Sequence, residues 1–205
     1  MPAAASDLRQ VKKDLRKASL ARRNALPAEM RIEAALGVAE HGASLQLIEQ
    51  AKNNEATIIG GYHPIRSELD PRPLMAQLAM QGWRLSLPVV TDDTTIVFRE
   101  LLRDGELVES GFGTVGPPPE VTEVAPDVLL MPLSVFDERC GRMGYGAGFY
   151  DRYIDKAAHG GRKPLLIGLA FETQRVDDVP MEPHDQYLDA IVTENRIIER
   201  AEVVR

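Results

Sequence analysis

The feature that most constrains the fold is a succession of short apolar runs that fills the chain after its first quarter. Most of these runs are rich in Val, Ile and Leu and do not alternate strictly, which is typical of strands buried in a largely parallel sheet. We predict strands at ATIIGGY (56–62), WRLSLPVV (83–90), TTIVFREL (94–101), DVLLMPL (127–133), LLIGLAF (165–171) and DAIVTE (189–194).

Helical patterns precede and separate these runs. Near the N-terminus, apolar residues recur at helical spacing at Leu8, Val11, Leu15 and Ala18. Further helices are predicted over residues 28–50, 72–81 and 148–158. Strands that alternate with helices predict a layered α/β fold. Residues 111–126 form a Gly/Pro-rich connection that is long enough to indicate a functional loop.

Composition indicates an ordinary globular protein. The chain has 205 residues, of which 44% are hydrophobic and 27% charged, so we predict one domain over residues 1–205. No run approaches the ~20 apolar residues of a membrane span, and the N-terminus lacks the apolar core of a secretory signal. Cys140 is the only cysteine and cannot form an internal disulfide, which favours a reducing, cytoplasmic location.

The net charge of −7 is unevenly distributed, because seven basic side chains lie within residues 1–23. An acidic chain with one local basic strip favours a small anionic ligand over nucleic acid. Lys12 and Arg16 are four residues apart, so they share one helix face and could contact one anion. A solvated basic face is an alternative, as is a membrane-surface helix, although Asp7 and Asp14 weaken the latter.

The segment GRMGYGAGFYDRYI (141–154) is the strongest candidate for a binding site. Backbone N–H groups of a flexible glycine loop and of a helix beginning near Gly148 could converge on a phosphate, and Arg142 would add a charged donor. Asp151 would then lie unfavourably close to the phosphate unless a cation separated them, which indicates Mg²⁺. The alternative is a surface turn followed by an acid that the helix dipole favours.

A dinucleotide-binding loop is a further candidate, because the glycines at 144, 146 and 148 resemble half of its fingerprint. The spacing is wrong, since Phe149 stands where the third glycine is expected. In addition, the loop does not follow its strand directly. These departures disfavour a nicotinamide-dependent oxidoreductase.

Taken together, these stretches resemble the 5-formyltetrahydrofolate cyclo-ligase family, also called methenyltetrahydrofolate synthetase. The resemblance spans nearly the whole chain, and it departs from the family pattern at Val-Gly-Pro-Pro (115–118) in the middle loop. It is carried by KKDLR (12–16), PIRSELD (64–70), LSLPVV (85–90), DVLLMPLSVFDERCGRMGYGAGFYDRYI (127–154) and IGLAFETQRVDDVPMEPHDQYLDAIVTE (167–194).

The resemblance implies a three-layer α/β sandwich and assigns roles to individual residues. It implies that ATP is bound by Lys12, Arg16, Arg142, Met143, Gly144, Tyr145, Gly146, Ala147, Gly148, Phe149 and Tyr150. It implies substrate contacts from His63, Glu68, Tyr145, Gly146, Ala147, Gly148 and Phe149. Asp151 and Asp185 match the family's Mg²⁺ ligands, and the catalytic residues would be Arg142, Tyr145 and Asp151.

The family uses ATP and Mg²⁺ to convert 5-formyltetrahydrofolate to 5,10-methenyltetrahydrofolate, ADP and phosphate through a phosphorylated formyl group. The resemblance therefore predicts this activity, in a protein that is a monomer or a weak homo-oligomer and has neither nucleic-acid nor membrane partners. A folate- or nucleotide-binding protein without turnover is the main alternative. His184 is interpreted as a loop residue and Cys140 as a packing residue rather than as a base or a nucleophile.

Overall fold

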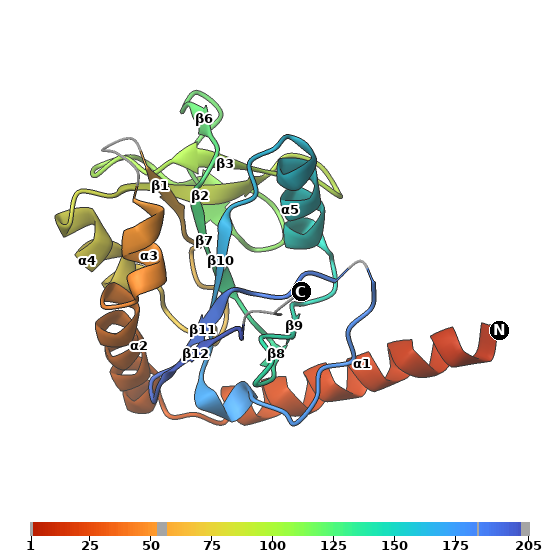
Figure 1. Cartoon of the computed structure of the whole chain (residues 1–205). Coiled ribbons are helices and arrows are strands. Elements are labelled where there is room, and N and C mark those ends of the chain that lie inside the picture. The colour runs from red at the N-terminus through yellow and green to blue at the C-terminus, as the bar shows by residue number, and fades with distance from the viewer. Residues whose placement is uncertain (1, 53–56, 184, 202–205) are drawn as a thin grey trace.

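The computed structural model describes residues 2–52, 57–183 and 185–201, with a twisted sheet at the centre (Figure 1). The helices are α1 (Pro2–Asn24), α2 (Ala28–Ala43), α3 (Gln46–Ala51), α4 (Arg72–Met80), α5 (Phe149–His159) and the short 3-10 helix η1 (Glu172–Gln174). The strands are β1 (Ile58–Gly60), β2 (Arg84–Val90), β3 (Ile96–Glu100), β4 (Val108–Glu109), β5 (Val115–Gly116), β6 (Glu123–Val124), β7 (Val128–Pro132), β8 (Val135–Phe136), β9 (Arg142–Met143), β10 (Leu165–Leu169), β11 (Ala190–Val192) and β12 (Ile197–Glu199).

The central sheet has the strand order β12-β11-β10-β7-β1-β2-β3-β6. Its five middle strands, from β11 to β2, are parallel to one another. The strands toward its two edges are added in antiparallel pairs: β12 on β11, β3 on β2 and β6 on β3. All six predicted strands are present within this sheet, and the predicted α/β class with a mostly parallel sheet is confirmed.

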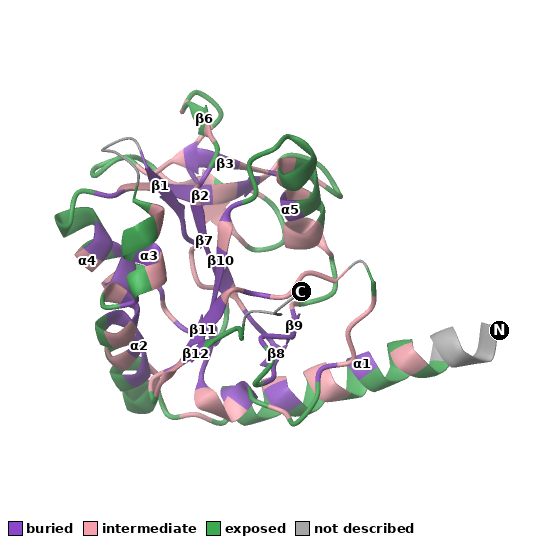
Figure 2. Cartoon of the chain, viewed as in Figure 1, coloured by how far each residue is buried: buried purple, intermediate pink, exposed green. Residues whose placement is uncertain are grey.

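Helices cover both faces of the sheet, with α2, α3 and α4 on one side and α5 on the other (Figure 1). Alternate residues of β7 pack on opposite faces of the sheet. Val128 and Leu130 belong to the core beneath α2–α4, whereas Leu129 and Met131 pack in the core that includes Ile154 of α5. The central strands are therefore buried on both faces (Figure 2), which explains why their sequences are continuously apolar.

The single helix predicted over residues 28–50 is wrong, because the structure has two helices there. α2 ends at Ala43, and Ser44 donates its N–H to the His41 carbonyl at 3.2 Å. Leu45 then adopts an extended conformation before α3 begins. Its side chain is fully buried in the core beneath α2–α4, so burial of Leu45 accompanies the change of direction.

Several very short strands were not predicted. β4 and β5 form a small hairpin, and β6 pairs with β3, so part of the 111–126 connection is folded. β8 and β9 form a second hairpin between β7 and residues 144–148, which we call the glycine loop. β12 closes the far edge of the sheet. The β8–β9 hairpin explains why the glycine loop does not follow β7 directly.

The buried face of α1 is polar, which the apolar spacing at its N-terminal end did not predict. Lys12, Ser19 and Arg23 are 7%, 0% and 1% exposed, whereas Val11 is 44% exposed. The Ser19 hydroxyl donates to the Ser134 carbonyl at 2.6 Å, which fixes the helix against the segment that precedes β8. Buried and exposed residues alternate along α1 (Figure 2). Its buried contacts combine the hydrogen bonds of these polar side chains with the packing of Leu15 against Val135 and Met143.

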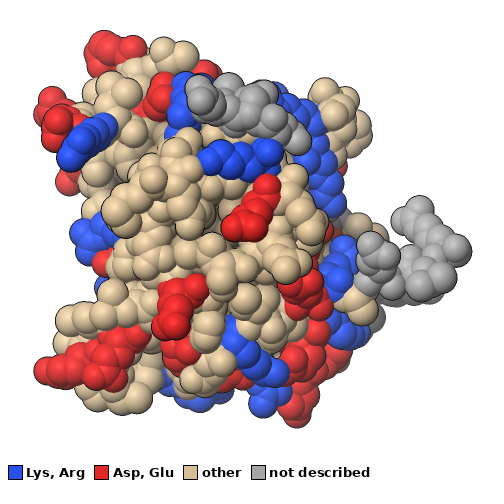
Figure 3. All heavy atoms as spheres, turned by 60° about the vertical axis from the view of Figure 1, so that its left-hand side comes forward, with Lys and Arg blue, Asp and Glu red and all other residues tan. Residues whose placement is uncertain are grey.

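Charges on the face shown in Figure 3 are of mixed sign, with basic and acidic side chains interspersed among uncharged residues. Across the described ranges, none of the helices is both long enough and apolar enough to cross a membrane.

Candidate active site

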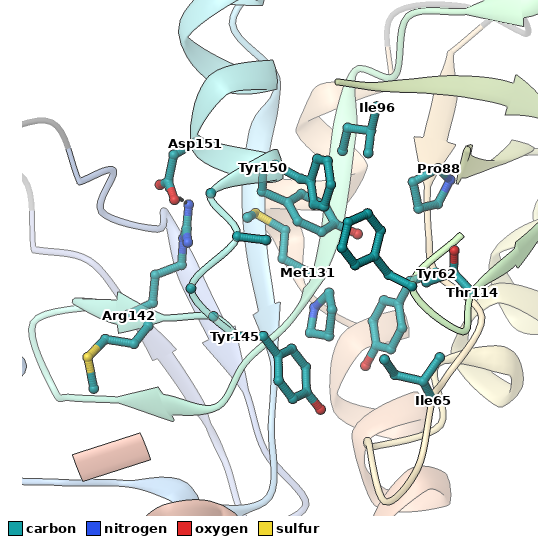
Figure 4. Close-up of a pocket in the computed structure, with 18 of the residues that line it drawn as sticks. Tyr62, Ile65, Pro88, Ile96, Thr114, Met131, Arg142, Tyr145, Tyr150 and Asp151 are labelled. Carbon is teal, nitrogen blue, oxygen red and sulfur yellow. Dashed lines mark hydrogen bonds and ion pairs between the residues drawn. The ribbon is translucent and has the colours of Figure 1, made fainter. Parts of the chain in front are cut away.

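A cavity of about 740 Å³ lies at the carboxyl ends of the parallel strands (Figure 4). The ends of β1, β2 and β7 contribute Tyr62, Pro88 and Met131, and the remaining walls come from α1, the glycine loop and the N-terminus of α5. Ligand sites of open α/β sheets commonly occupy this edge, where the loops that follow the strands meet.

Every site residue predicted from the sequence lines this one cavity. The set comprises Lys12, Arg16, His63, Glu68, Arg142, Met143, Gly144, Tyr145, Gly146, Ala147, Gly148, Phe149, Tyr150, Asp151 and Asp185. These residues lie between positions 12 and 185, so the fold brings together side chains that are far apart in the sequence. Met143, which immediately precedes the glycine loop, is buried and packs in a small cluster with Val135 and Val179.

The residues that line the cavity divide by chemistry into two groups, which we call halves, and Figure 4 shows Arg142 and Asp151 on one side of the glycine loop and Tyr62 on the other. The cationic half comprises Lys12, Arg16, Arg142, Asp151 and Asp185. The aromatic half comprises Tyr62, Glu68, Tyr145, Phe149 and Tyr150.

In the cationic half, Lys12 is held by two acids from the C-terminal part of the chain. Its Nζ donates to Glu182 Oε2 and to Asp185 Oδ2, both at 2.7 Å. Burial lowers the pKa of Lys12, but the hydrogen bonds and charges of Asp185 and Glu182 outweigh that effect and raise its pKa above the ordinary value. Lys12 is therefore a stably charged ammonium at the cavity wall.

Arg16 connects α1 to the glycine loop. Its Nε donates to the Gly144 carbonyl at 2.8 Å, and its guanidinium lies close to Gly146, where an added Cβ would be 3.8 Å from Cζ. Gly146 has a φ of +101°, which side chains rarely adopt. The loop conformation therefore requires glycine at this position.

Arg142, which precedes the glycine loop, forms an ion pair with Asp151, which follows it. Arg142 Nη2 donates to Asp151 Oδ1 at 2.7 Å (Figure 4), and the Arg142 side chain is only 5% exposed against 28% for Asp151. Asp151 lies in the first turn of α5, where the helix dipole favours an anion. Within the described part of the chain, Arg142 Nε has no hydrogen-bond partner.

Arg152 fixes the glycine loop from outside. Its Nη2 donates to the Ala147 carbonyl at 2.8 Å, and its Nε donates to the Thr94 carbonyl at 2.7 Å. The guanidinium also lies over the Phe149 ring, 5.4 Å from the centroid. The entry to α5 is thus tied to the segment before β3.

The aromatic half is lined by rings whose polar groups are mostly directed at the protein itself. The Tyr62 hydroxyl donates to the Leu69 carbonyl at 2.8 Å. Phe149 meets Phe112 edge to face, with centroids 5.3 Å apart, so the 111–126 connection does contribute to the cavity. The Tyr150 hydroxyl is buried and has no hydrogen-bond partner among the described residues.

Glu68 is the buried acid of the aromatic half. Its side chain accepts the Ile65 N–H at 2.8 Å and interacts with the Tyr145 hydroxyl. Burial raises the pKa of Glu68 above the ordinary value, although these hydrogen bonds and the charges of Arg23 and Arg66 oppose the shift.

Asp151 and Asp185 fit a particular type of metal site. Both carboxylates line the cavity, but within the described ranges no three His, Cys, Asp or Glu side chains gather to hold a metal ion. Mg²⁺ is usually held by one or two carboxylates together with water and substrate phosphates. The donor set therefore fits a Mg²⁺ whose other ligands come from a nucleotide, and it does not fit an all-protein metal cage.

Two residues of functional interest were missed at the sequence level. Glu182 bonds Lys12 and lies three residues before Asp185. Arg23 lies behind the cavity and bonds Tyr145. It follows Lys12 by eleven residues, which is three helical turns, so its position on the Lys12 face was available from the sequence.

Cys140 and His184 were interpreted as non-catalytic residues. Cys140 is fully buried among core residues, and burial raises the pKa of its thiol to about 12, which confirms it as a packing residue. His184 lies outside the described residues.

Comparisons with known proteins identify the family of the chain. The sequence model of the 5-formyltetrahydrofolate cyclo-ligase family matches residues 8–194. A 5-formyltetrahydrofolate cyclo-ligase of Haemophilus influenzae is 31% identical over 182 residues, 86% of this chain and 91% of that protein. That of Escherichia coli K12 is 36% identical over 138 residues, 64% of this chain and 75% of that protein.

Solved structures show the same relationship. The NMR structure of Aquifex aeolicus 5,10-methenyltetrahydrofolate synthetase has a TM-score of 0.77 and 28% identity, and the match covers 95% of each chain. A synthetase from Mycoplasma pneumoniae has a TM-score of 0.67 and 25% identity, covering 89% of this chain and 98% of that one. The fold is that of an α/β ligase. The chain belongs to the 5-formyltetrahydrofolate cyclo-ligase family.

Proposed function

We propose that this protein converts 5-formyltetrahydrofolate to 5,10-methenyltetrahydrofolate with ATP and Mg²⁺, releasing ADP and phosphate. Family membership supports the cyclo-ligase activity. The observation that carries the finer proposal is the division of one cavity into a cationic half and an aromatic half. This arrangement can hold a polyphosphate and a folate ring system side by side.

In this proposal the cationic half binds the phosphates of ATP. Lys12, Arg16 and Arg142 supply positive charge, and the glycine loop supplies backbone N–H groups at the start of α5. Lys12 and Arg142 are already paired with Asp185 and Asp151. Bound Mg²⁺ would be held by these two carboxylates and would neutralise charge on the phosphates. Lys12 and Arg142 would then be released toward the nucleotide.

The aromatic half would bind the folate. Glu68 presents a carboxylate able to accept hydrogen bonds from the N–H groups of a pterin, and Tyr145 and Phe149 offer rings beside it. His63 lines the same wall, although its residue type does not indicate a role. Because the glycine loop borders both halves, it lies where the formyl group and the γ-phosphate would meet.

The chemistry requires a better leaving group than an amide oxygen. Attack of the formyl oxygen on the γ-phosphorus releases ADP and gives a formyl phosphate ester. The neighbouring para-aminobenzoate nitrogen then attacks the formyl carbon, loses its proton, and phosphate departs. The protein's task is alignment, charge stabilisation and exclusion of water. For these tasks a rigid loop with Arg142, Tyr145 and Asp151 around it is well suited.

The test is a direct assay. The protein is mixed with 5-formyltetrahydrofolate, ATP and Mg²⁺, and the near-ultraviolet absorbance of the methenyl product is followed together with phosphate release. We expect one phosphate per methenyl group and loss of activity in excess chelator. Binding of both ligands without product would instead indicate a non-catalytic binding protein. Turnover without ADP or in chelator would refute the nucleotide mechanism.

A further inference from the structure

Arg23 is a buried arginine just behind the aromatic half of the cavity. It is 1% exposed, and its direct partners are hydroxyl groups. Nη2 donates to Tyr145 Oη at 2.7 Å, and Nε donates to Ser67 Oγ at 3.1 Å. Nη1 has no hydrogen-bond partner within the described ranges. A charge buried in this way is costly, so its position calls for an explanation beyond packing.

The two hydroxyls belong to two separate walls of the aromatic half. Tyr145 belongs to the glycine loop, and the Arg23 guanidinium also lies over its ring at 5.6 Å from the centroid. Ser67 immediately precedes Glu68, and its hydroxyl also bonds Asn24 at the end of α1. Arg23 therefore joins the helix to both segments that would contact the folate.

The same guanidinium acts on Glu68 electrostatically. Burial raises the pKa of Glu68, whereas the Ile65 N–H, the Tyr145 hydroxyl and the charges of Arg23 and Arg66 lower it. Arg66 is exposed and is screened by solvent and salt. Arg23 is the buried cation of the pair, so its charge reaches Glu68 with less screening.

Glu68 also lines a second hollow with His63, Asp70 and Arg72, in which Asp70 is paired with Arg72. On its buried side, the titratable groups that act on Glu68 include two phenols. Tyr62 and Tyr150 are both fully enclosed, and burial together with the Glu68 charge raises the pKa of each well above its ordinary value. They stay neutral in the working pH range. The charge state of Glu68 therefore depends mainly on its hydrogen bonds and on Arg23.

We propose that Arg23 is a positioning residue for the aromatic half, which fixes Tyr145 and the Ser67–Glu68 step without touching either substrate. It also favours the charged form of Glu68, the form that accepts two hydrogen bonds from a pterin-like N–H edge. The proposal rests on the proposed function, because it takes the aromatic half as the folate side. It adds a residue whose effect should be confined to that side.

The test compares Arg23→Gln with Arg23→Lys, and uses Arg22→Gln as the matched control. Arg22 is the adjacent arginine, and it donates to the Thr173 and Arg175 carbonyls away from the cavity. For Arg23→Gln we expect the KM for 5-formyltetrahydrofolate to rise about tenfold or more, while the KM for ATP changes less than about twofold. Arg22→Gln should change neither constant.

The pH profile gives a readout that a purely structural role would not change. The ionised form of Glu68 binds, so kcat/KM for the folate falls as pH drops through the Glu68 pKa. Removing a nearby positive charge raises that pKa, so the acid limb should move to higher pH in Arg23→Gln. Arg23→Lys keeps the charge and should restore the limb, although it cannot bond both hydroxyls.

A second variant covers the case in which Arg23→Gln does not fold. Tyr145→Phe leaves the guanidinium in place and removes only the hydroxyl, which contacts both Arg23 and Glu68. It should raise the KM for the folate and not that for ATP. In a stable double variant with Arg23→Gln, the two effects should be less than additive. Fully additive effects, an unchanged folate KM in Tyr145→Phe, or equal changes in both KM values would overturn the proposal.

Wild-type turnover separates this proposal from the proposed function. If the wild-type protein forms no methenyl product, the proposed function fails. The Arg23 variants are then compared by equilibrium titration with 5-formyltetrahydrofolate alone. Weaker binding in Arg23→Gln but not in Arg22→Gln would still support the positioning role, and equal binding would refute it.

Discussion

The two halves of the cavity differ in whether their polar groups are already paired by charge within the protein. In the cationic half, Lys12 and Arg142 are paired with Asp185 and Asp151, so the charges that we propose bind ATP are neutralised by the protein's own acids. In the aromatic half, Tyr62 is bonded to a backbone carbonyl, and its ring stands ready for contact. Binding in the first half therefore exchanges ion pairs, whereas binding in the second fills a prepared surface.

This difference has a physical reason. Isolated buried charges are costly, so a site for a polyanion is stabilised by internal counterions until the ligand arrives. Apolar rings carry no such cost and can remain unpaired. Glu68 is the exception in the aromatic half, and it has its own buried cation in Arg23.

Asp151→Asn should have the largest effect, because it removes the charge of a proposed metal ligand while keeping the side-chain shape. We expect kcat and kcat/KM to fall together by about 10²–10³. Kinetics and melting temperature should be measured together. Asp155→Asn is the control, since Asp155 lies one turn further along α5 and is 65% exposed. A stable and fully active Asp151→Asn protein would remove the metal assignment.

Lys12→Ala and Arg16→Ala should follow. A charge-assisted hydrogen bond is worth ~1.5–3 kcal/mol, so the KM for ATP should rise by about tenfold to a hundredfold in each variant. The KM for the folate should change much less. Lys13→Ala is the control, because Lys13 is an exposed neighbour on the same helix. Unchanged ATP constants in both variants would assign Lys12 and Arg16 to the structure alone.

Glu68→Gln should act on the other half. Gln keeps one acceptor oxygen and loses the charge, so we expect the KM for the folate to rise about tenfold, with little change for ATP. It should also stabilise the protein above the raised pKa of Glu68. At such pH the wild-type protein must bury a charged Glu68, which costs folding free energy that neutral Gln does not. Below the ordinary Glu pKa, Glu68 is protonated in both the folded and the unfolded state, so the stability difference should vanish. Thermal unfolding across pH checks the second part.

Gly146→Val should have the smallest kinetic effect, a several-fold rise in the KM for ATP. The φ of +101° at Gly146 strains a branched residue by ~1–3 kcal/mol, which should distort the glycine loop. Gly161→Val is the matched control. Gly161 has φ of +78° and no atoms near its added Cβ, and it does not line the cavity. It should lose similar stability with normal kinetics. Equal kinetic effects in the two variants would deny the loop a role in nucleotide binding.

The sequence predicted the elements that are apolar on both faces. The six strands were predicted because runs such as LLIGLAF are buried from both sides, so their composition reflects their position. Strands of two residues, such as β5 and β6, carry no period to detect. The break at Ser44 was missed because the sequence on both sides of it has helical character.

The site residues were predicted from resemblance, and their pairing was not. Lys12 and Asp185 are 173 positions apart in the sequence, so no local pattern could indicate that they bond. Arg23 was counted only among basic residues, because an arginine on an otherwise exposed helix is normally solvated. Only tertiary packing shows that the Lys12 face points inward and that three of its polar side chains are buried.

The polar face of α1 has a consequence for how the two ligands would communicate. Lys12 lies at one half of the cavity and Arg23 at the other, and their separation of eleven positions corresponds to about 16 Å of continuous helix. A helix moves as a rigid rod, so a tilt that improves contacts at one end changes the other. Cooperativity between nucleotide and folate would then be a property of α1, and by linkage each ligand would change the affinity of the other by the same factor.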